Sequence, residues 1–274
     1  MGKQYSFIKY FGGKNSNGLG KIILNEFPEK GSYDIYAEPF SGGFSIGLQT
    51  PEDRIAPIEI YNDLYNNVYS LFKVISDKEK FDQFKELCDV SYYSEAMRKD
   101  FKEKLEKEEL DDVHRAFYYF YVNRTSHNGN GGFSKNMVVR RNMAKSVSDM
   151  LSTIDRLPEL HQRLSRTLIL NRDGIDIIDN YNQPNVFLYC DPPYHQSTRT
   201  STRYSVDMDN GKQIEFLEAC LRSNAKLLIS GYDCEIYEEY LVQRGGFKKI
   251  QFEVNTMTGS YEKKIKTETL WKNY

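Results

Sequence analysis

The sequence lacks the features that identify most metal sites, disulfide frameworks and membrane proteins. No two of its four cysteines (Cys88, Cys190, Cys220 and Cys234) have CxxC spacing, and its four histidines form no ligand cluster with them. Metal binding and disulfides are therefore not expected, and free buried thiols are predicted. The chain has no run of about 18 apolar residues, so no transmembrane helix is expected. The apolar stretch of a signal peptide is missing from MGKQYSFIKYFGGK, so we expect a cytoplasmic protein.

Internal repeats and low-complexity tracts are also absent from the sequence. What is present is a chain of 274 residues, 39% of them hydrophobic. This length and composition predict a packed globular protein, built as one large domain or as one domain that carries an insertion.

Excess charge of one sign is lacking in the chain as a whole, which has a net charge of −2 and a pI of about 6.2. This balance argues mildly against a nucleic-acid partner. The segment from Arg115 to Arg172 differs, because it holds ten Lys or Arg residues and three acids, which is a local charge of +7. A local basic face is the relevant feature for phosphate binding, so the middle of the chain is the candidate nucleic-acid surface.

The hydrophobic pattern changes twice along the chain. Residues 33–38 and 55–61 have strand character and 64–75 have helical spacing, which is typical of an α/β unit. From about 76 to 165 the pattern is helical, with no expected strand and with a helical run over 144–157 that stops at Pro158. After about 166 the α/β pattern returns. We therefore predict one α/β domain, formed by residues 1–75 and 166–274, with a helical, basic insertion at 76–165.

A glycine turn, EPFSGG, follows the first expected strand. Glycine there lets a ligand approach the backbone closely, although the turn is not the GxGxxG fingerprint of dinucleotide-binding proteins, and a plain tight turn is an equal alternative. Asp63 lies 20 residues beyond Gly43, at the end of the next expected strand, where such folds place an acid against ribose hydroxyls. A helix N-cap is the alternative role of Asp63. Together the turn and the acid suggest an adenosine-containing ligand.

The stretch VFLYCDPPYHQ places an acid, two prolines and a tyrosine directly after an expected buried strand. Ligands of open α/β sheets bind beyond the carboxyl ends of the strands. The prolines remove two backbone N–H donors, so acceptors dominate there, and Tyr194 adds an aromatic face. Acceptors beside a stacking ring favour binding of an exocyclic amino group on a flat base. Hydrogen bonds from both N–H groups to Asp191 and a prolyl carbonyl would give a pyramidal nitrogen with an available lone pair.

Several motifs in order resemble one family. FIKYFGGK, EPFSGG, YND, VNRTSHNG and DPPY, followed by SGYDCEIYEEYL and KTETLWKNY, look like the Dam-type (class alpha) adenine-specific DNA N6-methyltransferases over nearly the whole chain. The resemblance implies an α/β, Rossmann-like domain dependent on S-adenosylmethionine, with an inserted, mainly helical target-recognition domain. It implies methyl transfer to N6 of an adenine that is flipped out of double-stranded DNA.

The resemblance also implies roles for particular residues. Tyr10, Lys14, Glu38, Phe40, Ser41, Gly42, Gly43, Asp63 and Asp191 would bind the cofactor, and Asp191, Pro192, Pro193 and Tyr194 would form the catalytic motif. No metal is implied, because the sulfonium methyl is already electrophilic. Candidate DNA contacts are Arg124, His127, Asn128, Lys135, Arg140 and Arg141, for each of which a solvated loop is the alternative.

The recognition region departs from the family pattern, because many members carry FNVPFG and this chain does not. His127 stands where those members have an aromatic wedge, so the resemblance does not predict a GATC target. The expected partner is double-stranded DNA and not a membrane, in a bacterial or phage-infected bacterial cell. A cognate restriction endonuclease is a further candidate partner, and a monomer or weak dimer is expected.

Two alternatives remain open at this point. One is an amino-methyltransferase that acts on cytosine N4 or on RNA adenine. The other is a non-catalytic DNA-binding module of the same fold, against which the intact DPPY argues.

Overall fold

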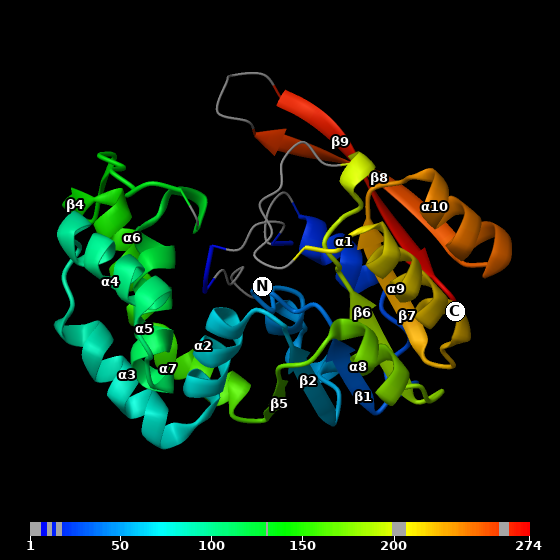
Figure 1. Ribbon diagram of the computed structural model, residues 1–274, viewed down its shortest axis with the longest axis horizontal. Helices are drawn as coiled ribbons and strands as arrows, with labels where there is room; N and C mark the ends of the chain where they lie inside the picture. Colours follow the sequence, from blue (N-terminus) through cyan, green and yellow to red (C-terminus); the bar gives the residue numbers. More distant parts are fainter. Residues whose placement is uncertain (1–6, 10–12, 15–17, 130, 199–206, 258–262) are drawn as a thin grey trace. The chain divides into compact units, whose positions relative to one another are not determined.

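The computed structural model describes residues 7–9, 13–14, 18–129, 131–198, 207–257 and 263–274. The chain divides into two compact units. The sheet unit comprises Met1–Tyr5, Lys14–Leu64 and Leu170–Tyr274, and the helical unit comprises Ser6–Gly13 and Tyr65–Ile169. Figure 1 labels the helices and strands of both units.

A seven-stranded sheet organises the first unit, in the order β5-β2-β1-β6-β7-β9-β8 (Figure 1). The pairs β1–β2, β1–β6 and β6–β7 are parallel, whereas β9 runs antiparallel to both β7 and β8. The strands are β1 (Ile35–Glu38), β2 (Ile58–Asn62), β5 (Thr167–Leu170), β6 (Val186–Cys190), β7 (Lys226–Gly231), β8 (Lys248–Met257) and β9 (Lys263–Lys272). Of β5, only Leu170 belongs to this unit. The mixed α/β class expected from the sequence is confirmed.

Both faces of the central strands are covered, which explains their almost continuous apolar sequences. One face carries Leu188 and Leu227 against helices α8 and α9, in a cluster that includes Phe216 and Trp271. The other face is aromatic, and there Phe187 contacts Phe27 with ring centroids 4.7 Å apart. The strand VFLYC is buried at all five positions. These two packed faces hold the carboxyl ends of β1 and β6 rigidly at one edge.

The helices and turns of the sheet unit are mostly short. Its α-helices are α1 (Leu19–Asn25), α8 (Gly174–Asn180), α9 (Asn210–Arg222) and α10 (Glu235–Tyr237), and α10 continues as a π-helix, η5 (Glu238–Arg244). Single 3-10 turns are η1 (Gly47–Gln49), η2 (Glu52–Arg54) and η4 (Gln196–Thr198). Asp209 is the N-cap of α9, and its side chain accepts a hydrogen bond from Lys212 N.

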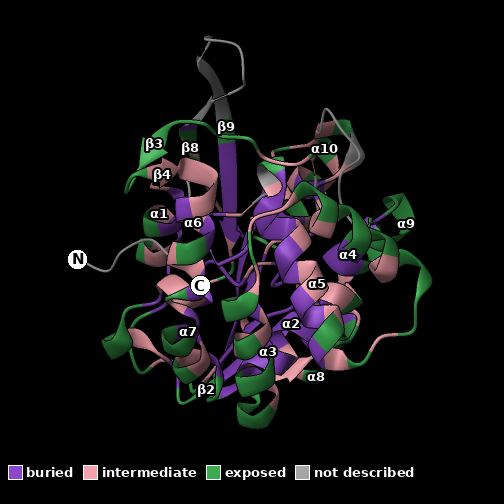
Figure 2. Ribbon diagram, turned by 90° about the vertical axis from the view of Figure 1, so that its left-hand side faces the viewer, coloured by how far each residue is buried: buried purple, intermediate pink, exposed green. Residues whose placement is uncertain are grey.

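The helical unit is built around α5. In Figure 2, buried residues follow α5, whereas α3 is largely exposed. Phe120 of α5 is fully buried, and Phe7 stacks on it with ring centroids 5.4 Å apart. The helices are α2 (Asn66–Ser76), α3 (Lys78–Val90), α4 (Glu95–Lys107), α5 (Asp112–Thr125), α6 (Lys145–Ile154) and α7 (Leu157–Leu164), with a 3-10 turn η3 (His127–Gly129). Helices α3, α4 and α5 are N-capped by the side chains of Asp77, Ser94 and Asp111.

Two expectations for the middle of the chain are wrong. A strand-free segment was expected, but β3 (Val139–Arg140) pairs antiparallel with β4 (Met143–Ala144). Arg141 and Asn142 form the turn with φ of 54° and 58°, a left-handed conformation that asparagine tolerates and that the hydrophobic pattern does not reveal. The helical run over 144–157 is two helices, and Pro158 lies in the first turn of α7 instead of ending α6.

None of the helices in the described residues is both long and apolar enough to cross a membrane. The four cysteines are free, as expected; Cys88, Cys190 and Cys220 are buried and Cys234 is half-buried. Burial raises the pKa of the Cys190 thiol, which keeps it protonated.

Candidate active site

The sheet has a topological switch point between β1 and β6. The chain passes from β1 to β2 on one side, and β6 is the neighbour of β1 on the other. In open α/β sheets the ligand crevice lies outside the carboxyl ends of the strands at this point. The register pairs Ala37 of β1 with Leu188 of β6. Glu38 follows Ala37 directly and Asp191 comes three residues after Leu188, so both lie at the carboxyl ends of these parallel strands. The cofactor motif and the DPPY motif are thereby brought together.

The EPFSGG turn is tied to the end of β2 by Ser41 and Asn62. The Ser41 backbone N–H donates to Asn62 O (2.9 Å), and its hydroxyl accepts from Asn62 N (3.0 Å) while donating to Glu38 O (2.7 Å). The Asn62 side chain bonds in turn to Pro39 O and to the Arg172 backbone. The turn is consequently a rigid structure rather than a loose loop.

Asp63 closes this turn. Its Oδ2 accepts a hydrogen bond from the Gly42 backbone N–H (2.8 Å), and Gly42 has a φ of 49° that favours glycine. The alternative role of Asp63 as a helix cap is wrong, because α2 begins at Asn66 and Tyr65 occupies the cap position without a side-chain bond. The carboxylate is therefore directed at the glycine turn.

Glu38 is buried at the base of the turn. Its Oε1 accepts hydrogen bonds from the Tyr36 hydroxyl (2.6 Å) and from Gly47 N (2.7 Å). Only glycine fits at position 47, because an added Cβ would lie 2.3 Å from the Phe44 ring. Burial raises the pKa of Glu38 to about 8, although both hydrogen bonds oppose the shift. The carboxyl group therefore holds a proton at neutral pH.

Replacement of Glu38 by glutamine should flatten the pH dependence of stability. Between pH 4.5 and about 8 the unfolded chain has lost this proton and the native state retains it, so wild-type stability should fall as pH rises through that window. At 1.36 kcal/mol per pH unit over this window, the total is on the order of 5 kcal/mol. Urea unfolding at pH 5, 6, 7 and 8 measures it. Equal pH slopes for wild type and Glu38→Gln would contradict the assignment, and the exposed Glu253→Gln is the control.

Asp191 is held on two sides at the end of β6. The Lys14 ammonium donates to its Oδ1 and lies 2.8 Å from both carboxylate oxygens, and the Ser230 hydroxyl of β7 donates to Oδ1 (2.8 Å). The Lys14 side chain is 3% exposed and that of Asp191 21%. Since a carboxylate can accept about four hydrogen bonds, Asp191 retains capacity for another donor.

Tyr194 and the prolines complete the edge. The Tyr194 hydroxyl accepts from Lys14 (2.6 Å), and the Lys14 ammonium lies 4.9 Å from the ring centroid. Pro193 O accepts from the Gln213 side chain (2.7 Å), which makes the Pro192 carbonyl the other candidate acceptor for an amine. Lys14, Asp191 and Tyr194 were all expected at the site from the sequence, and they form one network.

Two residues of this network were not predicted from the sequence. Ser230 lies in an ordinary-looking strand, KLLISG, and Glu268 in the terminal segment KTETLWKNY. Glu268 accepts from the Tyr194 hydroxyl (3.1 Å). Burial of an acid on a strand would have marked Glu268, but burial of a single residue cannot be recognised from the local sequence.

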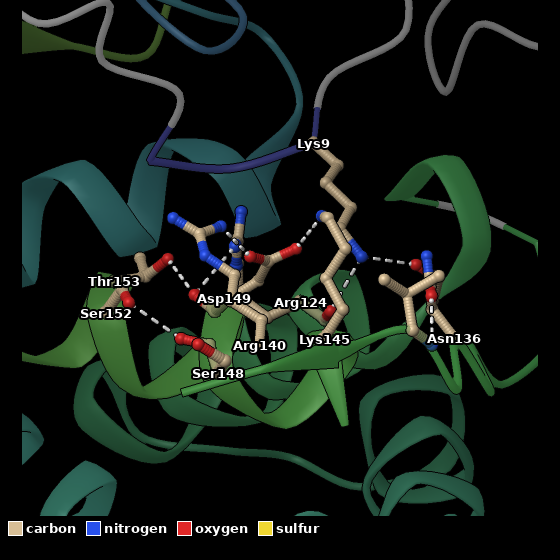
Figure 3. Close-up of polar contacts among 11 residues, drawn as sticks. Lys9, Arg124, Asn136, Arg140, Lys145, Ser148, Asp149, Ser152 and Thr153 are labelled. Atoms are coloured by element: carbon tan, nitrogen blue, oxygen red, sulfur yellow. Dashed lines mark hydrogen bonds and ion pairs between the residues drawn. The ribbon is translucent and has the colours of Figure 1, made fainter. Parts of the chain in front are cut away.

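The basic residues of the helical unit differ in accessibility. Arg124 is buried, and its guanidinium donates to Asp149 O (3.2 Å). Burial lowers the pKa of Arg124 to about 10. Figure 3 shows that Asp149 also holds Arg140 and Lys145, and the Arg140 guanidinium is 2.8 Å from its Oδ1. Arg140 is about half exposed, so it remains available to a ligand while Arg124 is enclosed within the unit.

The loop that carries His127 is organised by Arg98 of α4. Arg98 donates to the Ser126 hydroxyl (3.1 Å) and to Gly131 O (2.6 Å), and His127 N bonds to Gly132 O (2.8 Å). His127 itself is exposed. The exposed histidine therefore lies on a loop whose backbone is held by hydrogen bonds.

The remaining candidates have varied surroundings. Lys135 is exposed, and its Nζ lies 3.1 Å from Glu95 Oε2. The Arg141 guanidinium donates to the Ser152 hydroxyl (2.9 Å). Phe40 is half-buried, with its ring edge on Phe216. Tyr10 falls outside the described residues, and the side chain of Asn128 is not described.

The fold and the motifs at the carboxyl ends of β1 and β6 define the class of protein. A mainly parallel α/β sheet, with an acid-closed glycine turn after β1 and an Asp-Pro-Pro-Tyr motif after β6, is a Rossmann-like methyltransferase fold. Residues 10–257 match the family described as D12 class N6 adenine-specific DNA methyltransferase, and the chain belongs to this family. It is therefore an adenine-specific DNA methyltransferase, and the sequence-based prediction of the family is confirmed.

Two curated relatives agree with this family. The chain is 25% identical over 245 residues to the Type II methyltransferase M.MjaIII of Methanocaldococcus jannaschii, which covers 82% of this chain and 83% of the relative. It is 24% identical over 256 residues to a DNA adenine methylase of Serratia marcescens, with 88% of each chain covered.

Proposed function

We propose that the protein transfers a methyl group from S-adenosylmethionine to N6 of an adenine turned out of double-stranded DNA at a specific sequence. The observation that carries the proposal is Asp191, a partly exposed carboxylate held by Lys14 and Ser230 beside the acid-closed glycine turn. The family assigns the reaction on adenine, and the proposal adds the cofactor, the residues and the state of the base.

The residues at the glycine turn fit the cofactor. Ser41, Gly42 and Gly43 lie beside the half-buried Phe40, and Asp63 offers a carboxylate suited to ribose hydroxyls. Glu38, buried below the turn, would support the cofactor site through its hydrogen bond from Gly47 N. When bound, S-adenosylmethionine supplies an electrophilic sulfonium methyl group, so the protein needs to supply alignment and polarisation.

Asp191 and the proline backbone would prepare the amine. The exocyclic nitrogen of adenine is a poor nucleophile, because its lone pair is delocalised into the ring. One N–H donating to Asp191 and the other to the Pro192 carbonyl would favour a pyramidal nitrogen. Lys14 keeps the carboxylate in place through both oxygens, and the Tyr194 ring offers the aromatic contact for the base.

DNA binding is proposed for the helical unit. The β3–β4 hairpin exposes Arg140, Arg141 and the apolar side chains of Met137, Val138 and Val139. A basic, projecting hairpin is suited to phosphates and to a groove of DNA. Contacts to phosphate would offset the few kcal/mol that flipping a base costs. Residues 76–165 remain our proposed target-recognition domain, with His127 and Lys135 as further contacts and Arg124 as an internal support.

Removal of Arg140 and Arg141 should weaken binding to all DNA sequences alike. The Arg140–Asp149 ion pair is exposed and therefore costs little to exchange for phosphate. If both residues meet phosphates, the slope of log K against log[salt] should fall by about 0.9 for each lost contact. Anisotropy titrations of the double variant Arg140→Ala/Arg141→Ala measure the change. They are made at several salt concentrations, on an unmethylated duplex that contains the target sequence and on a scrambled duplex.

A matched double variant controls for general loss of positive charge. Lys102→Ala with Lys107→Ala removes two exposed lysines of α4 that pair with acids of the same helix. This variant should keep the wild-type slope. Equal affinities and slopes for both double variants would show that the arginines are merely solvated, whereas a loss on the target duplex alone would indicate base reading.

Product analysis tests the reaction itself. Duplex DNA incubated with protein and methyl-labelled S-adenosylmethionine should yield N6-methyladenine after digestion to nucleosides. N4-methylcytosine as the product, or labelling of RNA in place of DNA, would contradict the proposal. One relative is named a Type II methyltransferase, so a cognate restriction endonuclease stays a candidate partner.

A further inference from the structure

Tyr194 is more constrained than a simple stacking platform would need to be. The residue is 7% exposed, and its ring packs edge-on against Tyr232 with centroids 4.8 Å apart. Its hydroxyl lies between two charged groups: it accepts from the Lys14 ammonium (2.6 Å) and donates to Glu268 Oε2 (3.1 Å). The orientation of the ring thus depends on both charged partners.

Glu268 reaches this point from the C-terminal hairpin. Strand β9 pairs with β7 through Ser230–Leu270 and Gly231–Thr269, which places Glu268 just beyond the carboxyl end of β7. The residue is 7% exposed. Burial raises the pKa of Glu268, the charge of Lys14 opposes the rise, Asp191 adds to it, and hydrogen bonds from Tyr194 and Tyr232 oppose it. An acid is costly at such a position unless its hydrogen bonds are made there.

The direction of the hydrogen bonds explains why an acceptor is needed. A phenol has one O–H donor, and Tyr194 directs it at Glu268. Its lone pairs are then available to the Lys14 ammonium, which donates to Asp191 as well. Removal of the acceptor at position 268 would take away the group at which the phenol proton is directed. The Lys14–Asp191 geometry would then lose one of its restraints.

We propose that Glu268 is a positioning residue for methyl transfer, which acts through the Tyr194 hydroxyl to fix Lys14 and Asp191 in the geometry that receives the amine. The inference rests on the proposed function of Asp191 and Tyr194. Glu268 acts as the acceptor for the phenol proton, so an amide oxygen in the same place should serve nearly as well as the carboxylate.

Two substitutions separate this role from a contribution to folding. Glu268→Gln keeps the acceptor and the shape, and kcat should stay within about fivefold of wild type. Glu268→Ala removes the acceptor, and kcat should fall about 10- to 100-fold, less than the 10²–10³ of a direct contact to the reacting group. The KM for DNA and the cofactor affinity should change by less than about threefold in both variants. Glu253→Ala, an exposed acid on the partner strand β8, is the control and should keep wild-type kcat.

A double-mutant cycle tests the route through Tyr194. In a Tyr194→Phe background the phenol proton is gone, so Glu268→Ala should lower single-turnover rates by less than about threefold further. Multiplicative losses in the double variant, or an unchanged kcat in Glu268→Ala, would overturn the inference. A fall in cofactor or DNA affinity that accounts for the whole loss would also overturn it.

Failure of this inference is distinguishable from failure of the proposed function. If Asp191 variants stay active, the proposed site is wrong whatever Glu268 does. If Asp191→Ala is inactive while Glu268→Ala turns over normally, the proposed function stands and only the role of Glu268 is rejected.

Discussion

Asp191→Ala is expected to abolish methyl transfer while the protein remains folded. Asp191 is the carboxylate that would accept one N–H of adenine, and loss of one preorganised electrostatic contact typically costs about 10²–10³ in rate. The variant also leaves the Lys14 ammonium, 3% exposed, without its carboxylate partner, so some loss of stability should accompany the loss of activity. Single-turnover assays with labelled cofactor measure the rate, and circular dichroism and calorimetry check folding and cofactor binding.

Asp191→Asn separates charge from shape at this site. The amide keeps the volume and one acceptor, yet we expect a loss of at least tenfold, because its NH₂ group would face the donors Lys14 and Ser230. Asp179→Asn, which removes an exposed acid paired with Arg222 in the same unit, should be fully active. Activity of Asp191→Ala within a factor of a few of wild type would reject the catalytic role.

Asp63→Ala should weaken S-adenosylmethionine binding more than any other single change at the glycine turn. Charge-assisted hydrogen bonds from ribose hydroxyls are each worth about 1.5–3 kcal/mol, which corresponds to roughly tenfold or more in Kd. Substitution also removes the acceptor for Gly42 N, so the turn itself should loosen. Isothermal titration calorimetry measures the cofactor affinity directly.

Asp63→Asn serves as the matched variant, because its amide oxygen can still accept from Gly42 N. It should bind cofactor with an affinity between wild type and Asp63→Ala. DNA binding in the absence of cofactor should be unchanged in both variants, since the proposed DNA contacts lie in the helical unit. Unchanged calorimetry for Asp63→Ala would leave Asp63 only the structural role of holding Gly42.

The strands and helices of the sheet unit could be predicted because their patterns are long and local. VFLYC reads as a buried strand, and it is buried at every position because both faces of the sheet are covered. The β3–β4 hairpin could not be predicted, since its strands have two residues each and its turn depends on positive φ at Arg141 and Asn142. Pro158 was misread because proline is compatible with the first turn of a helix as well as with its end.

The candidate site could be predicted only where a motif spans consecutive residues. DPPY and EPFSGG are visible in the sequence, and Asp63 follows at a fixed distance. Ser230 and Glu268 could not be found, because they join Asp191 and Tyr194 through the pairing of β6, β7 and β9. Arg124 was grouped with exposed basic residues, yet the packing of α5 against α6 encloses it.

By itself the sequence determined the family, the chemistry and the order of the parts, since these depend on residue types at short spacings such as those of DPPY. Only the tertiary structure decided that Asp63 holds the glycine turn instead of capping a helix, that Glu38 is buried with a raised pKa, and that Glu268 meets Tyr194. Each of these depends on contacts between residues far apart in the chain. Burial and hydrogen-bond direction are properties of such contacts, and no local pattern of residues specifies them.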